Sequence, residues 1–216
     1  MKISVIIPTK NEPLIGQLVN EIHESLSDQD HEIIVVDKSE KKSEISNAKL
    51  ISQKSDGLGN AIMEGLNYVK GDAIVIMDGD LSHNPTDINR LVQELNTFDI
   101  VIGSRYIKGG ITDDKIHRKF FSHVFRSIAN PILGLNVKDS MSGFSAIKKE
   151  VFDNLTINPL GYKINMEVMF KGIKEGYKVG EVPINFQIRK SGKSKANFKE
   201  AFRILRYIFE LKTGLR

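Results

Sequence analysis

The sequence predicts an α/β fold in which helices flank a mainly parallel sheet. Short runs rich in Ile and Val alternate with longer segments whose apolar residues recur every three or four positions. The run Ala73–Met77 is apolar throughout, which is typical of a strand buried on both faces of a parallel sheet. Repeated strand–helix units of this kind build parallel sheets with right-handed crossovers.

The expected elements alternate through the first half of the chain. Strands are expected at Lys2–Ile7, Glu32–Val36, Ala48–Ser52, Ala73–Met77 and Asp99–Ile102. Apolar residues spaced by four predict helices over Leu14–Leu26 and Gly57–Val69. A third helix is expected to begin at Asn84-Pro85, where proline suits the first turn.

Two segments of the second half, His117–Leu133 and Phe198–Leu211, are amphipathic, aromatic and basic. Each predicts a helix with one apolar side, which comprises Phe120, Phe121, Val124, Phe125, Ile128 and Ile132 in the first and Phe198, Phe202, Leu205, Ile208 and Phe209 in the second. Such helices can lie in a membrane interface, and equally their apolar sides can pack on the domain core.

Length and composition indicate a folded, non-secreted protein. The 216 residues suit one domain over 1–196, followed by a C-terminal amphipathic basic helix over 197–216. No run approaches the ~20 apolar residues of a membrane-spanning helix. Because Met1 leads straight into a strand and cysteine is absent, we expect no signal peptide, no disulfide and a cytoplasmic location.

Positive charge is concentrated at the C-terminus. The segment Gln187–Arg216 has nine Lys or Arg residues against two Glu, whereas the whole chain has a net charge of only +4. A basic segment of this kind favours an anionic partner such as a phosphate, a nucleic acid or a membrane surface. A solvated helix face is the plain alternative.

The motif Asp78-Gly79-Asp80 directly follows the buried run Ala73–Met77. The carboxyl ends of strands in open α/β sheets are where ligands bind. Two carboxylates around a glycine suggest a divalent cation that holds a phosphate, and a strand-ending turn is the alternative. The sequence has no Walker A loop, no Gly-x-Gly-x-x-Gly after the first strand and no Gly-x-Ser-x-Gly, which disfavours P-loop enzymes, conventional dehydrogenases and serine hydrolases.

Further motifs occur in a fixed order over nearly the whole chain. They are Val5-Ile6-Ile7-Pro8-Thr9-x-Asn11-Glu12, Val35-Val36-Asp37, Gly57-Leu58-Gly59, Met77-Asp78-x-Asp80-Leu81-x-His83-x-Pro85, Ile102-Gly103-Ser104-Arg105-Tyr106, His117-Arg118-Lys119, Asp139-x-x-Ser142-Gly143-Phe144, Gly161-Tyr162-Lys163-x-x-Met166-Glu167, Val182-Pro183 and Ile188-Arg189-x-x-Gly192-x-Ser194-Lys195. This set resembles the inverting GT-A glycosyltransferases, and in particular the dolichyl-phosphate mannosyltransferases and related polyprenyl-phosphate glycosyltransferases. The resemblance implies a GT-A (Rossmann-like) sheet with C-terminal amphipathic interface helices.

The resemblance also implies a donor site for a nucleotide-sugar. The residues implied to bind the donor are Pro8, Glu12, Asp37, Asp78, Gly79, Asp80, Arg105 and Lys163. Asp78 and Asp80, with Ser82 in the same loop, would bind Mg²⁺ or Mn²⁺ on the donor diphosphate. Lys163 as a solvated helix residue is the plain alternative.

An acceptor site for a lipid phosphate is implied in the same way. The residues implied to face the acceptor phosphate are Arg118, Ser122, Arg189 and Ser194. Those implied to act in the transfer are Asp80, Asp139, Arg118 and Arg189. Asp139 would lie near the transferred sugar, unless it only caps a turn.

The reaction implied is metal-dependent, inverting transfer of a hexose, with mannose expected, from GDP-mannose to a polyprenyl (dolichyl) phosphate. Because that acceptor is already anionic, no strong general base is required. The protein is expected on the cytoplasmic face of a membrane, held by its amphipathic helices or by a membrane partner subunit. Nucleic acid is not expected, since the aromatic residues recur at helical spacing and not as a stacking platform.

Some positions depart from the family pattern. Lys38 replaces a second Asp, Lys10 replaces a frequent aromatic residue, and Ser82 replaces a usual Gln. These changes leave open the nucleobase and the metal shell. UDP-glucose is therefore an alternative donor, and an inert membrane-surface binding protein on the same fold is an alternative of a different class.

Overall fold

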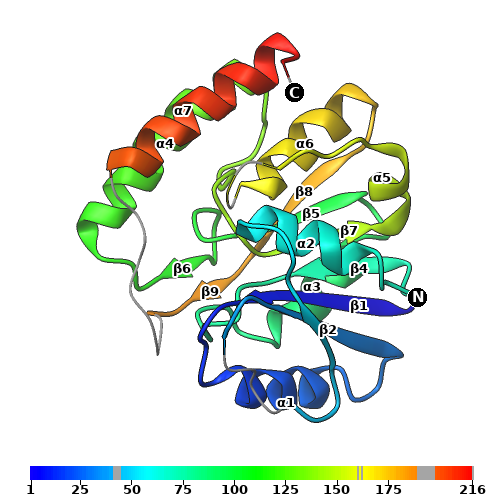
Figure 1. The fold of residues 1–216 in the computed structure, drawn as a ribbon. Coiled ribbons are helices and arrows are strands. Elements are labelled where there is room, and N and C mark those ends of the chain that lie inside the picture. The colour runs from blue at the N-terminus through cyan, green and yellow to red at the C-terminus, as the bar shows by residue number, and fades with distance from the viewer. Residues whose placement is uncertain (41–44, 160, 162, 189–197, 216) are drawn as a thin grey trace.

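Seven strands form a central sheet in the part of the chain that the computed structural model describes, residues 1–40, 45–159, 161, 163–188 and 198–215 (Figure 1). The strands are β1 (Ile3–Thr9), β2 (His31–Asp37), β3 (Lys49–Ser52), β4 (Ala73–Ile76), β5 (Ile100–Ser104), β7 (Ser145–Lys148) and β8 (Val179–Pro183). Their order is β3-β2-β1-β4-β7-β5-β8, and β7 alone runs antiparallel to its neighbours among these strands. The predicted mainly parallel sheet is confirmed.

Helices cover both faces of this sheet. They are α1 (Ile15–Ser25), α2 (Leu58–Leu66), α3 (Asp87–Glu94), α5 (Lys149–Asn154) and α6 (Ile164–Lys174). Along β1, Val5 and Ile7 join the apolar core that contains α1 and α3, whereas Ile6 joins the core that contains α2, α5 and α6. Successive side chains of a strand point to opposite faces, so one apolar strand contributes to both cores.

The first strand is longer than predicted. It continues through Pro8 to Thr9, and the parallel register pairs Pro8 with Val36 and Thr9 with Asp37. Proline lacks only the N–H donor and keeps its carbonyl acceptor, so it is tolerated near the end of this strand. The extra length brings Thr9 directly beside the carboxyl end of β2.

A smaller unit lies at the carboxyl ends of the large sheet's parallel strands. It consists of β6 (Ile111–Thr112) paired with β9 (Asn185–Phe186), the helix α4 (Ile116–Leu133) and the helix α7 (Phe198–Thr213). The two helices pack against one another, and Figure 1 shows α7 lying along α4. Residues 189–197, between β9 and α7, fall outside the described residues, and so does the predicted domain boundary after residue 196.

Of the apolar sides predicted for these two helices, only Phe125 on α4 and Ile208 on α7 are buried among the described side chains, and the other residues that enter the core lie outside the predicted sets. The residues buried in the core are Phe125, Ala129 and Leu133 on α4 and Ile204, Tyr207, Ile208 and Leu211 on α7. Phe120 and Phe209 are exposed at 64% and 62%, and Phe121 and Leu205 are exposed as well. Each helix therefore packs on the domain core and also presents aromatic residues outward, and contact of these residues with a membrane interface stays a prediction.

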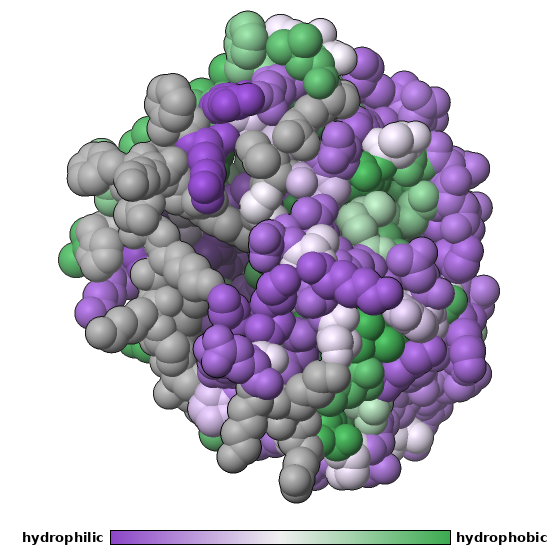
Figure 2. Space-filling view, viewed as in Figure 1, coloured by the Kyte–Doolittle hydropathy of each residue, from purple (hydrophilic) through white to green (hydrophobic). Residues whose placement is uncertain are grey.

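The surface in Figure 2 is mostly hydrophilic, and hydrophobic residues gather at its top, where Figure 1 places the end of α7. Leu215, just beyond that helix, is 72% exposed. In the described part of the chain, no helix combines the length and the apolar character needed to cross a bilayer.

Candidate active site

The acidic loop begins one residue after β4 and contains Asp78 and Asp80. Asp80 is buried, and its Oδ1 accepts the Ser82 hydroxyl at 2.5 Å and the Ser82 backbone N–H at 3.1 Å. Between them, Leu81 has a φ of +60°, a left-handed conformation that a bulky residue rarely adopts. Strained backbone of this kind is retained where surrounding contacts over-determine it, often at functional sites. Ser82 is fully buried and thus orients the Asp80 carboxylate.

Asp78 is fixed from two sides. Its backbone N–H donates to Nδ1 of His83 at 3.3 Å, and the buried His83 ring stacks on Phe144 with ring centres 4.8 Å apart. A Cβ at Gly143 would lie 3.2 Å from the Asp78 carboxylate, so Gly143 lets the Asp-x-x-Ser-Gly-Phe segment pass closely. The sequence interpretation gave His83 no role, although His83 stands in a quoted motif.

Gly79 is required by packing. A Cβ at Gly79 would lie only 2.7 Å from Cγ2 of Thr9, closer than non-bonded atoms approach. The acidic loop therefore rests against the end of β1. This contact explains the glycine between the two carboxylates without any ligand.

Asp37, at the end of β2, is buried, and only one of its two carboxylate oxygens is hydrogen-bonded in the described residues. Its Oδ1 accepts the hydroxyls of Thr9 at 3.0 Å and Ser39 at 2.6 Å, and the Ser39 backbone N–H at 3.1 Å. Its Oδ2 is buried without a hydrogen-bond partner in the described residues. An unpaired buried carboxylate oxygen requires an explanation, and a ligand N–H or O–H donor is one. Pro8 and Glu12, the other predicted nucleoside contacts, precede and follow Thr9, and Glu12 is partly buried.

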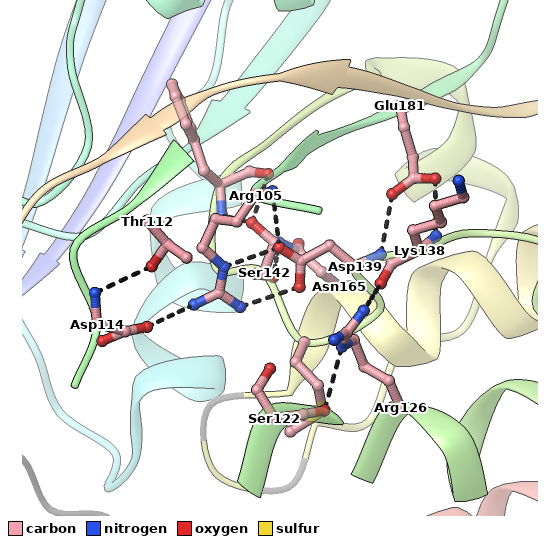
Figure 3. A network of polar contacts seen from close by, with 12 residues as sticks. Arg105, Thr112, Asp114, Ser122, Arg126, Lys138, Asp139, Ser142, Asn165 and Glu181 are labelled. Atoms are coloured by element: carbon pink, nitrogen blue, oxygen red, sulfur yellow. Dashed lines mark hydrogen bonds and ion pairs between the residues drawn. The ribbon is translucent and has the colours of Figure 1, made fainter. Parts of the chain in front are cut away.

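Arg105 follows β5 and lies among carboxylates (Figure 3). Its Nε and Nη2 donate to the two oxygens of Asp139 at 2.8 and 2.9 Å, and its Nη1 donates to Asp114 at 3.2 Å. Burial acts to lower the pKa of the guanidinium, but the hydrogen bond and charge of Asp139, together with the charge of Asp114, raise that pKa above its ordinary value. Arg105 is therefore a permanent cation, and its guanidinium N–H groups are bound by the carboxylates of Asp139 and Asp114.

Asp139 is fully buried at the centre of this network. Both of its carboxylate oxygens bind Arg105, and its backbone N–H donates to Glu181 on β8 at 2.9 Å. The Lys138 N–H donates to the second Glu181 oxygen at 2.7 Å. The structure thus places Asp139 as the link between Arg105 and the sheet, with no part of its side chain exposed.

The predicted acceptor residues Arg118 and Ser122 lie four positions apart, on one face of α4. Arg118 Nη1 pairs with Asp114 at 3.0 Å, and its side chain is 30% exposed. The Ser122 hydroxyl is buried and has no hydrogen-bond partner among the residues that the structure describes. Arg189 and Ser194 lie outside the described residues.

Buried hydroxyls without a partner are frequent around this cluster. Besides Ser122, those described are Ser104, Tyr106 and Ser140, which directly adjoin Arg105 or Asp139 in the sequence. Lys163 precedes α6, is 8% exposed, and its Nζ donates to the Met141 carbonyl at 3.1 Å. It is a buried residue beside the Asp139 segment and not a solvated helix residue.

A divalent cation fits the Asp78–Asp80 loop only together with a ligand. Among the described residues, no group of three His, Cys, Asp or Glu side chains is arranged to hold a metal. Magnesium is commonly held by one or two carboxylates while substrate phosphates supply further oxygens. The Asp80 carboxylate, held by Ser82, and the nearby Asp78 carboxylate are thus enough protein ligands for a cation that arrives with a diphosphate.

Comparison with known proteins agrees with this geometry. The profile of glycosyl transferase family 2 matches residues 4–156. The dolichol-phosphate mannosyltransferase of Pyrococcus furiosus is 40% identical over 98% of this chain, which spans 64% of that protein. The protein of the same name from Saccharomyces cerevisiae is 30% identical over 96% of this chain and 86% of its own length.

Solved structures share the fold. Glucosyl-3-phosphoglycerate synthase from Mycobacterium tuberculosis in complex with phosphoglyceric acid superposes with a TM-score of 0.72 over 99% of this chain and 79% of that chain, at 23% identity. The same protein with Mn²⁺, uridine-diphosphate and phosphoglyceric acid gives a TM-score of 0.72 over 97% and 76%, at 22% identity. By its profile match and its curated relatives, the chain belongs to glycosyl transferase family 2 and, within it, to the dolichol-phosphate mannosyltransferase family.

Proposed function

We propose that this protein transfers mannose from GDP-mannose to a polyprenyl phosphate, with inversion at the anomeric carbon and with Mg²⁺ or Mn²⁺. The observation that carries the proposal is the Asp78–Asp80 pair at the carboxyl end of β4, where Ser82 binds the Asp80 carboxylate and His83 binds the Asp78 backbone N–H. The identity to dolichol-phosphate mannosyltransferases over nearly the whole chain supports the choice of sugar and acceptor.

The donor would lie across the carboxyl ends of β1, β2 and β4. Asp37 offers the unpaired Oδ2 to a donor group of the nucleoside, with Pro8 and Glu12 beside it. A divalent cation bound by Asp78 and Asp80 would offset the charge that develops on the diphosphate leaving group. Mn²⁺ and uridine-diphosphate are present together in the synthase of the same fold, a precedent for this use of the fold.

The acceptor phosphate would bind at the first turns of α4. Arg118 supplies a charge and Ser122 an unpaired hydroxyl on the same helix face, and Arg189 and Ser194 remain predicted contributors. The phosphate oxygen is the nucleophile and is already anionic, so the protein's task is to orient it opposite the leaving group. Asp139 and Lys163 would support this geometry from within the fold.

Membrane contact would come from the exposed apolar residues of α4 and α7. Phe120 and Phe209 are more than half exposed, and basic residues of both helices could meet anionic headgroups. We place the protein on the cytoplasmic face of a membrane, bound to the surface or to a membrane partner subunit.

The proposal is tested by calorimetric titration of GDP-mannose into the purified protein with Mg²⁺ or Mn²⁺, then with EDTA, beside UDP-glucose. Binding of GDP-mannose that requires metal, followed by transfer of mannose to a short polyprenyl phosphate in detergent, is the expected result. Asp78→Ala should abolish metal-dependent binding, whereas Asp72→Asn, at the opposite end of β4, should leave it intact. Binding of UDP-glucose alone would mean that the donor is UDP-glucose in place of GDP-mannose. Binding of neither nucleotide-sugar would favour an inert binding protein.

A further inference from the structure

Asp114 joins two arginines that come from different parts of the chain. It lies between β6 and α4 and is 8% exposed. Its Oδ2 accepts from Arg105 Nη1 at 3.2 Å, and its Oδ1 lies 3.0 Å from Arg118 Nη1 in an ion pair. No motif in the sequence pointed to Asp114.

The backbone around Asp114 is held in place independently of these ion pairs. The Asp114 N–H donates to the Thr112 hydroxyl at 3.1 Å, and the Asp113 N–H donates to the Phe186 carbonyl at 3.0 Å. Thr112 and Phe186 are themselves paired in the two-stranded sheet. Asp114 is therefore a fixed point from which a longer side chain can be positioned.

Hydrogen bonds and ion pairs form a continuous chain from the large sheet to α4, and Figure 3 shows its members Glu181, Asp139, Arg105 and Asp114. Glu181 fixes the Asp139 backbone, Asp139 fixes Arg105, and Arg105 shares Asp114 with Arg118. Along this chain the exposed fraction of the side chain is 0% at Asp139, 10% at Arg105, 4% at Asp114 and 30% at Arg118. Only the last member reaches the solvent to a substantial extent, so the chain ends in a cation that is available to a ligand.

We propose that Asp114 is a positioning residue that sets the Arg118 guanidinium for the acceptor phosphate, an inference that rests on the proposed function. Arginine otherwise loses considerable side-chain freedom when it binds. A carboxylate that is already ion-paired with the Arg118 guanidinium restricts the rotamers of that side chain before the phosphate arrives, which is preorganisation. The chain to Glu181 ties that position to the sheet on which the donor would bind.

Charge and geometry predict opposite effects of removing Asp114. Asp114 is an anion beside a phosphate site, so by charge alone its loss would strengthen phosphate binding. If Asp114 acts by positioning, its loss weakens phosphate binding although the repulsion is gone. Whether phosphate binding becomes weaker or stronger therefore decides between a positioning role and a purely electrostatic effect of Asp114.

The experiment compares Asp114→Asn with Asp113→Asn, which removes the same charge from an exposed neighbour outside the cluster. We expect Asp114→Asn to raise the KM for lipid phosphate about tenfold and to leave the affinity for GDP-mannose unchanged, while Asp113→Asn changes neither. In the Arg118→Gln background, Asp114→Asn should add little. Thr112→Val, which removes only the hydroxyl that accepts the Asp114 N–H, should have a smaller effect in the same direction and serves if Asp114→Asn does not fold.

A binding measurement separates this inference from the proposed function. Calorimetric affinity for geranyl phosphate, a soluble isoprenyl phosphate, requires no sugar transfer. Weaker binding in Asp114→Asn with unchanged binding in Asp113→Asn supports the role of Asp114 even if wild type transfers no mannose. Unchanged or tighter binding in Asp114→Asn, an equal loss of donor affinity, or no binding by wild type would overturn it.

Discussion

The donor and acceptor sides of the site are held by different kinds of contact. On the donor side, Asp80 is bound by Ser82 and Asp37 by Ser39, each two residues away, with Thr9 added from the adjacent strand. On the acceptor side, Arg118 pairs with Asp114, which also binds Arg105, a residue first expected to bind the donor; Arg105 in turn is bound by Asp139, which is 34 residues away. The donor carboxylates are thus set largely by their own loops, whereas Arg105, which connects the acceptor side to the sheet, is set by the meeting of distant segments.

This difference predicts how substitutions on each side will affect the protein. Local hydrogen bonds to a carboxylate persist as long as the loop keeps its shape, so the donor side should fail mainly when its ligands are removed. Buried ion pairs between distant segments depend on the whole fold, and removal of one partner leaves an uncompensated charge. The acceptor side should therefore lose geometry and stability together.

The largest expected effect comes from a donor ligand. Asp80→Asn removes one carboxylate charge while it keeps the side-chain volume and the acceptor for Ser82. We expect turnover to fall by about a thousandfold or more, because the charge of the leaving group is no longer offset. Steady-state kinetics and circular dichroism check this, with Asp72→Asn as the control. A mutant that retains metal-dependent turnover would contradict the donor assignment.

Arg105→Lys tests the acceptor side. Lysine keeps the charge but cannot form the two-point contact with Asp139, so we expect the free energy of unfolding to fall by about 3 kcal/mol. Urea denaturation measures it. The matched control is Arg206→Lys, whose pair with Glu210 on α7 has an arginine side chain 68% exposed and should change stability by less than about 0.5 kcal/mol. Equal effects in both variants would remove the contrast between the two sides.

Phe209→Glu tests whether the exposed side of α7 contacts lipid. If the exposed Phe209 ring inserts into the membrane interface, its replacement should weaken vesicle binding about tenfold. Sedimentation with vesicles of anionic lipid measures this loss. Tyr68→Glu, which changes a 38% exposed aromatic residue that follows α2, is the control. A loss of the same size in both would show that binding is not specific to the helix pair.

The smallest effect is expected at Asp99, which directly precedes β5. Burial raises the pKa of Asp99. The hydrogen bonds from the Lys148 side chain and the Lys178 N–H lower that pKa by a larger amount, so it lies below its ordinary value of 3.8. A carboxyl whose pKa is lower in the folded state stabilises the fold above its unfolded pKa, and the gain is lost as the pH falls through the folded pKa.

Asp99→Asn should therefore lower the free energy of unfolding by about 1 kcal/mol at pH 7, and the difference should vanish as the pH falls below 3.8. Urea denaturation across pH measures it, with Asp153→Asn of an exposed pair on α5 as the control. A difference independent of pH would mean that Asp99 acts through packing and not through charge.

The sequence by itself determined the order of elements in the first half and the donor carboxylates. Apolar runs predict buried strands, and Asp37, Asp78 and Asp80 directly follow such runs, so their place at one edge of the sheet follows from parallel topology. These features are local, because hydrophobic periodicity, turn residues and strand ends each depend on only a few neighbouring positions of the sequence.

The tertiary structure alone decided three features. They are the antiparallel insertion of β7 between β4 and β5, the division of α4 and α7 into buried and exposed apolar residues, and the chain of hydrogen bonds and ion pairs from Glu181 to Arg118. Each depends on which distant segments meet. A resemblance could place Arg105 near phosphates, but only folding shows that Asp139 and Asp114 occupy its fork, since no local pattern encodes a partner 34 residues away.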